Sequence, residues 1–436
     1  MGRLMRVHDH QIAKAGCSTI ALQCEAHARK APSKGTTIMN MLSIWPTLVI
    51  IGVTILILSV KRVFSCLDTA PVAHQHRLDS IDGLRGILAS AVVFHHFVMT
   101  AYNLKNRTSG LPPSPFYSFI GPGAVAVFFM ITGYLFWGRL IDRQGNIKWL
   151  ELYVNRAFRI YPLYLLLIVA YFIFVIRHVG IAATQTMGQT AAQLSQWLFF
   201  GIVNQPTPFL NRPEYLGLVG QTWSLHYEWL FYMALPLLAI VAREKATVAI
   251  TASAFIFMLF GNAVITDLSV VFIEHFLIGM LTASLLRTYP KLKGNGAVRS
   301  FVAIVAGAFA ILISGGPYTN LATVLLGISF FCIASGASAF GILTAAGTKR
   351  LGNISYSIYL LHGLIINLLM QFPRYNANLV FTTQRFWLVT FLTYGCIIAV
   401  SIATYYVIER GGINLGRRII QNLPANATRS NSALAE

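Results

Sequence analysis

The sequence predicts an all-α polytopic membrane protein with a ten-helix transmembrane core and one extra N-terminal transmembrane helix. Apolar residues make up 56% of the 436-residue chain and charged residues only 11%, whereas soluble domains average about 45–50% and about 25%. The mean hydropathy of the whole chain is +0.64. This composition excludes a disordered protein, a soluble enzyme and a disulfide-rich secreted scaffold, and it makes the lipid bilayer the expected surroundings.

Apolar runs long enough to cross a bilayer recur along the chain. A spanning helix needs about 20 mostly apolar residues, because the hydrocarbon core is about 30 Å thick. Such runs occur at 43–60, 86–101, 121–140, 161–179, 223–242, 247–264, 268–286, 298–314, 318–336, 354–371 and 386–408. The first run stands apart, and the other ten form the predicted core. A weaker apolar stretch at 191–204, inside the loop 180–222, predicts an interfacial or re-entrant segment.

The distribution of basic residues predicts the orientation. When the last ten spans start from the cytoplasm, the inside segments carry 21 Lys and Arg residues and the outside segments carry 6. Cytoplasmic loops collect basic residues, so the polar tail 413–436 is expected in the cytoplasm. The same rule accounts for the formal net charge of +19. We therefore expect no nucleic acid partner, although such a charge on a soluble domain would indicate one.

The N-terminal part departs from this distribution. Residues 1–40 form a polar segment with six basic residues, which the extra helix at 43–60 would place outside the cell. The segment lacks the apolar core and cleavage site of a signal peptide. We expect that translation starts at Met39 or Met41. The intact mass of protein expressed from its native gene tests this expectation, because a mass that begins at Met1 would contradict it.

Several ionisable side chains fall inside the predicted spans, where they are rare and usually functional. They are His95, His96, His226, Glu228, Glu274, His275 and His362. At 1.5 Å per residue, His96 lies roughly 15 Å and His362 roughly 12 Å from the cytoplasmic side, and Glu228 roughly 8 Å from the outer face. Any one of them could be a hydrogen-bonded packing residue. Together they predict a buried cavity that opens outward, with His96 near its floor.

Three arginines lie at the predicted cytoplasmic ends of spans. Arg85 and His96 are eleven residues apart, so they share a helix face at an axial separation of about 16 Å. This layout suits a long ligand with an anionic head and a reactive tail. Arg156 and Arg159 are three residues apart and can bind one phosphate group from two sides. The alternative for all three is a role as topology or lipid headgroup anchors.

Six short segments between residues 77 and 412 carry recognisable motifs. They are Ser80-Ile81-Asp82-Gly83-Leu84-Arg85-Gly86 with the following Phe94-His95-His96-Phe97; Gly123 to Leu135; Tyr153 to Pro162, which contains Arg156, Arg159 and Ile160; Trp223-Ser224-Leu225-His226-Tyr227-Glu228; Gly352 to His362; and Tyr406-Val407-Ile408-Glu409-Arg410. In this order they resemble the acyltransferase 3 family of integral membrane acyltransferases. Four positions depart from the family pattern: Ala126, Thr132, Trp229 and Gly411.

The resemblance implies a ten-helix core that moves acyl groups, commonly acetyl, from cytoplasmic acyl-CoA to sugar hydroxyls of envelope or exported glycans. It implies a multi-pass protein of the bacterial cytoplasmic (inner) membrane, of the stand-alone kind without an extramembrane hydrolase-like domain. The donor substrate would be acyl-CoA, with acetyl-CoA as the default. No metal is expected, and the five cysteines show neither metal-ligand nor disulfide spacing. Lipopolysaccharide, exopolysaccharide, a signalling oligosaccharide and a small glycosylated metabolite all remain open as acceptors, as does the oligomeric state.

Within this resemblance we assign expected roles to individual residues. His96 would be the catalytic histidine, either as general base or as a covalent acyl carrier. Glu228 would orient a histidine or bind the acceptor hydroxyl, and His362 would either support His96 or have a structural role. Arg85, Arg156 and Arg159 would hold the CoA phosphates.

Two other classes of protein fit parts of the sequence. A transporter or flippase could use the buried His and Glu residues as a proton relay, but the sequence contains no inverted repeat or paired broken helices. A structural or sensory protein that has lost activity would be free to lose Arg85 or His96, and both are present. The transporter predicts substrate movement without CoA turnover, and the enzyme predicts acyl transfer that depends on His96.

Overall fold

The structure is a computed structural model that describes residues 41–68, 79–180, 186–202, 205–242, 247–261, 268–294, 296–370, 372 and 382–422. Throughout this part of the chain the regular elements are helices, without a β-strand. The expected N-terminal segment 1–40 and the end of the expected C-terminal tail, 423–436, lie outside it.

The longer helices follow one another along the chain with short connections. They are α5 (Trp45–Ser59), α6 (Lys61–Phe64), α7 (Asp79–Asn106), α8 (Pro115–Asp142), α9 (Trp149–Val179), α10 (Met187–Leu198), α11 (Trp223–Val241), α12 (Thr247–Gly261), α13 (Leu268–Thr288), α14 (Ala297–Ile313), α15 (Asn320–Ala334), α16 (Ala346–Asn353), α17 (Ser355–Leu369), α19 (Thr383–Thr404) and α20 (Arg410–Gln421). Short 3₁₀ turns join several of them, including η2 (Ser65–Leu67), η5 (Gly220–Thr222) and η7 (Ile342–Thr344).

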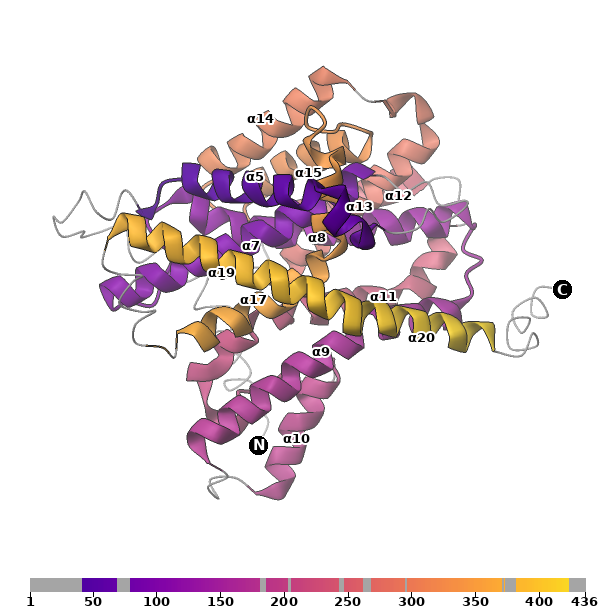
Figure 1. Cartoon of the computed structure of the whole chain (residues 1–436). Helices are drawn as coiled ribbons and strands as arrows, with labels where there is room; N and C mark the ends of the chain where they lie inside the picture. Colours follow the sequence, from indigo (N-terminus) through magenta and orange to yellow (C-terminus); the bar gives the residue numbers. More distant parts are fainter. Residues whose placement is uncertain are drawn as a thin grey trace.

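The helices α7 and α8 pack together at the centre of the bundle, and α13 covers α8 (Figure 1). The pair α14 and α15 lies above them in the same view, α5 lies beside α7, and α9 projects below with α10 alongside it. Aromatic side chains fill the interface of α8, α11 and α13, where Phe231 stacks on Phe276 at a ring-centroid distance of 4.5 Å and Phe129 packs tilted against Phe276 at 4.8 Å.

Each of the eleven predicted runs coincides with helix in the described residues, but the helices differ in length. Six are long and apolar enough to cross a membrane, and the count is up to eight if two bent pairs each form one span. The bent pairs are Trp45–Ser59 with Lys61–Leu67, at 75°, and Ala346–Asn353 with Ser355–Leu369, at 63°. Three apolar helices are shorter, at Thr247–Phe260, Ala297–Ile313 and Asn320–Ala334. The chain is therefore a multi-pass helical membrane protein, and the count of ten plus one stays a prediction.

The helix α9 is longer than the apolar run 161–179 that predicts it. It begins at Trp149, so Arg156 and Arg159 lie about 10–15 Å along its axis from its first residue instead of preceding it. The weaker stretch 191–204 overlaps α10, which has 12 residues and a capping box formed by Thr186 and Gln189. At about 18 Å, α10 is too short to span a bilayer.

Two of the sequence motifs meet where α7 packs against α16. A Cβ atom at Gly83 would collide with the carbonyl oxygen of Leu343 in η7, and one at Gly352 would collide with the carbonyl oxygen of Asp82. Gly86 in turn faces the backbone nitrogen of Gly352. Glycines at these positions let the two backbones touch, and the contact places Arg85, which lies between Asp82 and Gly86, beside the start of α17.

The last long helix contains a wide turn. A π-helical segment, η8 (Tyr405–Glu409), joins α19 to α20, and Figure 1 shows α20 continuing the direction of α19. Single π turns inside α-helices often occur at functional sites. Here the wide turn brings the buried side chain of Glu409 against α17, where it accepts a hydrogen bond from Ser357 at 3.1 Å.

Candidate active site

The structure brings together two of the three side chains predicted to be catalytic. Nε2 of His362, on α17, lies 3.2 Å from Nδ1 of His96, on α7, and the ring centroids are 4.9 Å apart. His362 is fully buried, whereas His96 keeps part of its surface accessible. The two residues are separated by 266 positions in sequence, so the tertiary packing of α7 against α17 makes the pair.

Backbone carbonyls around the pair indicate where the ring protons lie. Nδ1 of His362 faces the carbonyl oxygens of Tyr359 at 2.7 Å and Ile358 at 3.3 Å. Because a carbonyl only accepts, this Nδ1 carries the proton and Nε2 of the neutral ring is an acceptor. Nδ1 of His96 faces Val92 O at 3.0 Å as well as that acceptor. His96 therefore carries its proton on Nδ1, and the lone pair of its Nε2 is available for chemistry.

The neighbouring His95 has a different environment. Its Nδ1 donates to the carbonyl oxygen of Tyr117 at 2.6 Å, and its ring packs so closely on α8 that a Cβ atom at Gly121 would overlap it. Successive residues on a helix point 100° apart, and the two adjacent histidines accordingly contact different helices. His95 therefore joins α7 to α8 as a packing residue.

The three arginines predicted to bind phosphate lie in one cluster with two carboxylates. Arg85 is close enough to Arg159, Glu228 and Glu409 to interact with all three electrostatically. Arg156 interacts with Arg159 and Glu228, and its guanidinium lies over the ring of Phe136 at 5.3 Å. The arginines and Glu228 are half-buried, so a bound anion could still reach them.

Glu228 lies near the arginines, from which its expected depth separates it. Its carboxylate accepts a hydrogen bond from Tyr232, one turn further along α11, and the same hydroxyl interacts with Arg156. Counting residues from the outer face placed Glu228 apart from the arginines. The helix α9 begins twelve residues before the apolar run, so Arg156 and Arg159 lie within a helix, and Glu228 joins their cluster.

Glu409 is a member of this cluster that the sequence-based choice of residues missed. Its side chain is 1% exposed, is held by Ser357 and interacts with Arg85 and Arg159. Tyr356, next to Ser357, donates to the carbonyl oxygen of Ile160 at 2.7 Å, which fixes α17 against α9. The signal in the sequence was the position of Glu409 in the last of the six motifs.

Tyr359 joins the histidine pair to the arginine cluster. Its ring lies 6.1 Å from that of His362, and its hydroxyl bonds Ser224 at 2.7 Å and the carbonyl oxygen of Gln221 at 3.0 Å. It also interacts electrostatically with Glu228. Tyr359 and His362, both on α17, thus lie between His96 of α7 and Glu228 of the arginine cluster.

Three other ionisable residues of the predicted spans lie outside both clusters. Glu274 and His275 lie on α13, fully buried, and Nδ1 of His275 bonds the carbonyl oxygen of Val271 at 2.6 Å. His226 lies near the start of α11, where its Nδ1 faces the carbonyl oxygen of Phe200 at 3.3 Å. Among the described residues, no three His, Cys, Asp or Glu side chains gather closely enough to hold a metal ion.

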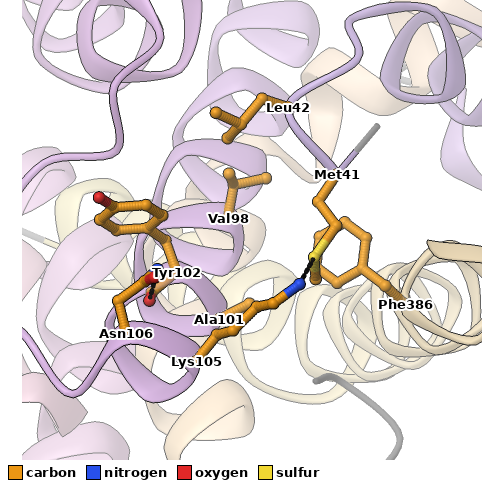
Figure 2. A pocket seen from close by; sticks show the side chains of 8 residues that line it. All are labelled: Met41, Leu42, Val98, Ala101, Tyr102, Lys105, Asn106 and Phe386. Atoms are coloured by element: carbon orange, nitrogen blue, oxygen red, sulfur yellow. Dashed lines mark hydrogen bonds between the residues drawn. The ribbon is translucent and has the colours of Figure 1, made fainter. Parts of the chain in front are cut away.

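A small pocket lies near the other end of α7 (Figure 2). Val98, Ala101, Tyr102 and Lys105 line it from α7, and Met41 and Phe386 close it. These α7 positions recur every three to four residues and define one face, and Val98 is about 160° around the helix from His96. This pocket is therefore not the cavity expected above His96.

The comparisons with known proteins agree with the motifs. The sequence profile of the acyltransferase domain of the acyltransferase 3 family matches residues 78–406. The chain is thus an integral membrane acyltransferase and belongs to this family. It is similar to the exopolysaccharide production protein ExoZ of Rhizobium meliloti (strain 1021), with 26% identity over 262 residues, which cover 58% of this chain and 78% of that protein. No solved structure matches the chain significantly.

Proposed function

We propose that this protein transfers an acyl group, acetyl by default, from cytoplasmic acyl-CoA to a sugar hydroxyl of an exported polysaccharide. Membership of the acyltransferase family supports the reaction class. The name of the relative from Rhizobium meliloti favours exopolysaccharide over lipopolysaccharide as the acceptor. The observation that carries the proposal is the hydrogen bond between His362 and His96, which leaves Nε2 of His96 available.

In the first route His96 acts as general base. Its Nε2 takes the proton of the sugar hydroxyl while the sugar oxygen attacks the thioester carbonyl. The C–S bond then breaks, the ester C–O bond remains, and the CoA sulfur receives the proton from the imidazolium. The acceptor nitrogen of His362 stabilises the Nδ1–H of His96 throughout, so His362 is a positioning residue.

In the second route His96 carries the acyl group. Nε2 attacks the thioester carbonyl, the C–S bond breaks so that CoA leaves as the thiolate, and an acyl-imidazolium that keeps its Nδ1 proton forms. The sugar hydroxyl then attacks this intermediate, giving the ester and regenerating the neutral imidazole. The thiolate takes the proton that the sugar hydroxyl releases. The same Nδ1–H tautomer of His96 serves both routes, because each needs the lone pair on Nε2.

The arginines Arg85, Arg156 and Arg159 hold the phosphates of the donor in this proposal. Guanidinium groups bind phosphate oxygens through paired hydrogen bonds, and Arg85 of the cluster lies about 16 Å along α7 from His96. A donor with its phosphates at the arginines extends its thioester arm toward His96. Glu228 and Glu409 position the guanidinium groups when the site is empty.

The test measures ester-linked acetyl groups on exported polysaccharide. A deletion strain is complemented with the wild-type protein or with His96→Ala, at matched levels in the membrane. We expect acetylation with the wild type and none with the variant. Equal acetylation would remove His96 from the mechanism. If neither protein restores acetyl groups but the wild type restores export of the polysaccharide, the protein is a transporter or flippase.

A further inference from the structure

The segment from α5 to Asp68 lies outside the region that the family profile matches, which begins at residue 78. Nevertheless several of its polar contacts converge on α16, the short helix that precedes α17. Arg350 of α16 donates from Nε and Nη2 to the two carboxylate oxygens of Asp68, at 2.8 and 2.9 Å. Its third nitrogen donates to the carbonyl oxygen of Leu58 at 2.7 Å.

Three further contacts join the same two segments. The backbone nitrogen of Gly347 donates to Ser59 Oγ at 3.2 Å, and the side-chain amide of Asn353 donates to the carbonyl oxygen of Leu67 at 2.8 Å. Gly347 also packs so closely on α5 that a Cβ atom there would overlap the carbonyl oxygen of Ile55. The segment 45–68 therefore holds α16 at its first, middle and last turns.

The side chain of Arg350 is almost completely buried. Its side chain is 3% exposed, whereas that of Asp68 is 51% exposed. A guanidinium buried to this extent needs partners for its donors, because an unpaired buried charge costs several kcal/mol. Asp68 and Leu58 supply these partners, and both belong to the segment 45–68.

On its other side α16 contacts α7, which carries residues of the candidate active site. Gly352 packs against Asp82 and Gly86 of α7, the residues that flank Arg85. Immediately after α16 the chain bends by 63° into α17, which carries His362. A displacement of α16 would therefore move the arginine at one end of the site and the histidine at the other.

We propose that the N-terminal segment 45–68 positions the active site by holding α16, with Asp68 and Arg350 as positioning residues for acyl transfer. This inference rests on the proposed function for its kinetic consequence. Its structural consequence, the ordering of α16 and α17, does not depend on that function and is measured separately.

The chain contains a matched control for the ion pair. Arg287 on α13 donates from Nε and Nη2 to both oxygens of Asp142 at the end of α8, each at 2.7 Å, and Asp142 is 57% exposed. This pair has the same bidentate geometry, and Asp142 is about as exposed as Asp68, although Arg287 is 24% exposed against 3% for Arg350. It joins helices that do not include α16.

The experiment compares the full-length wild type with Asp68→Asn, Asp68→Glu and Asp142→Asn in lipid nanodiscs. The first readout is hydrogen–deuterium exchange of residues 346–369, and the second is kcat and KM for acyl transfer. We expect Asp68→Asn to raise exchange in this segment and to lower kcat/KM by about tenfold or more, since small misplacements of reacting groups cost up to about 10²-fold. Asp68→Glu keeps the carboxylate and should recover part of the loss, and Asp142→Asn should change neither readout.

The outcomes separate the inference from the proposed function. If Asp68→Asn behaves like Asp142→Asn in both readouts, the segment does not position the site. Raised exchange with unchanged kcat/KM also overturns the inference, because α16 would then be mobile without effect on the reaction. If the wild type shows no acyl transfer, the proposed function fails, and unchanged exchange in Asp68→Asn would overturn the attachment on its own.

Discussion

His362 Nε2 lies 3.2 Å from His96 Nδ1, and this single contact joins α17 to α7 at the depth where acyl transfer is proposed. In this position His362 accepts a hydrogen bond from the protonated Nδ1 of His96, as an orienting carboxylate would. Unlike a carboxylate, a neutral histidine carries no charge. It therefore fixes the orientation of His96 without adding a buried anion to the site.

The first prediction concerns His362. Asn at this position lacks the ring nitrogen at the place of Nε2, so the orientation of His96 loosens. We expect His362→Asn to lower kcat by about tenfold to a hundredfold, less than the factor of about 10²–10⁴ that a general base contributes. The KM for acyl-CoA should stay nearly constant, because the arginines are unchanged. Steady-state kinetics on nanodisc-embedded protein measures both constants.

His95→Gln is the control for this change. The amide of Gln can still donate to the carbonyl oxygen of Tyr117, the partner of His95, so we expect most of the activity to remain. A loss in His95→Gln as large as that in His362→Asn would assign the effect to general disturbance of α7.

The second prediction concerns the donor phosphates. Arg159→Gln removes a charged donor, and a charged hydrogen bond contributes about 1.5–3 kcal/mol. We expect the KM for acetyl-CoA to rise by about 10- to 100-fold, which is the same free energy expressed as a ratio. Acetyl-pantetheine has the same thioester arm but no phosphate. With this donor the variant and the wild type should have equal kcat/KM, and an equal loss with both donors would show that Arg159 does not bind phosphate.

The positions of these arginines show what hydropathy can and cannot predict. Apolar runs located the long apolar helices, because lipid-facing surfaces need apolar side chains along their whole length. They did not show that α9 begins at Trp149, since its first turns are amphipathic and carry charge on the side that faces the bundle. Arg156 and Arg159 were therefore expected just before the apolar run, and the structure places them in α9, with Arg156 near Glu228.

Glu409 and the bend before α17 were less accessible to sequence reasoning. The carboxylate follows directly on the apolar run 386–408 and reads as a residue of the cytoplasmic surface, but the π turn and Ser357 bury it. The bend of 63° between α16 and α17 depends on contacts with α5 and α7, which are distant in sequence. In contrast, the separate surroundings of His95 and His96 follow from the 100° step between adjacent residues of one helix.

The third prediction tests the contact between α7 and α16. Gly352→Ala adds a Cβ atom that would overlap the carbonyl oxygen of Asp82, and overpacking of this kind costs about 1–3 kcal/mol or more. We expect a lower thermal unfolding temperature and a fall in activity. Gly395→Ala on α19 is the matched control, because no atom lies within 4 Å of the added carbon. Equal unfolding temperatures for the two variants would show that the close approach is not needed.

The fourth prediction concerns pH. The hydrogen bonds from Arg350 hold the pKa of Asp68 below its ordinary value of 3.8. A carboxylate whose pKa is lowered by folding stabilises the folded state at pH values above the ordinary pKa, and this contribution is lost as the pH falls through the lowered value. We expect the difference in unfolding temperature between wild type and Asp68→Asn to be constant from about pH 5 to about pH 8 and to shrink below about pH 4. A difference that changes near neutral pH would point to another titrating group.

The π turn at Tyr405–Glu409 determines which side chains of α20 face α9 and which face away from it. One additional residue in a helical turn rotates the rest of the helix by about 100° around its axis. With this rotation, Gly412 and Gly416 face Phe158 of α9 while the exposed Arg417 and Arg418 face away. Deleting a single residue from 405–408 would keep the composition and the hydropathy of the helix almost unchanged. It would nevertheless turn Glu409 away from Ser357 and move bulkier side chains onto α9.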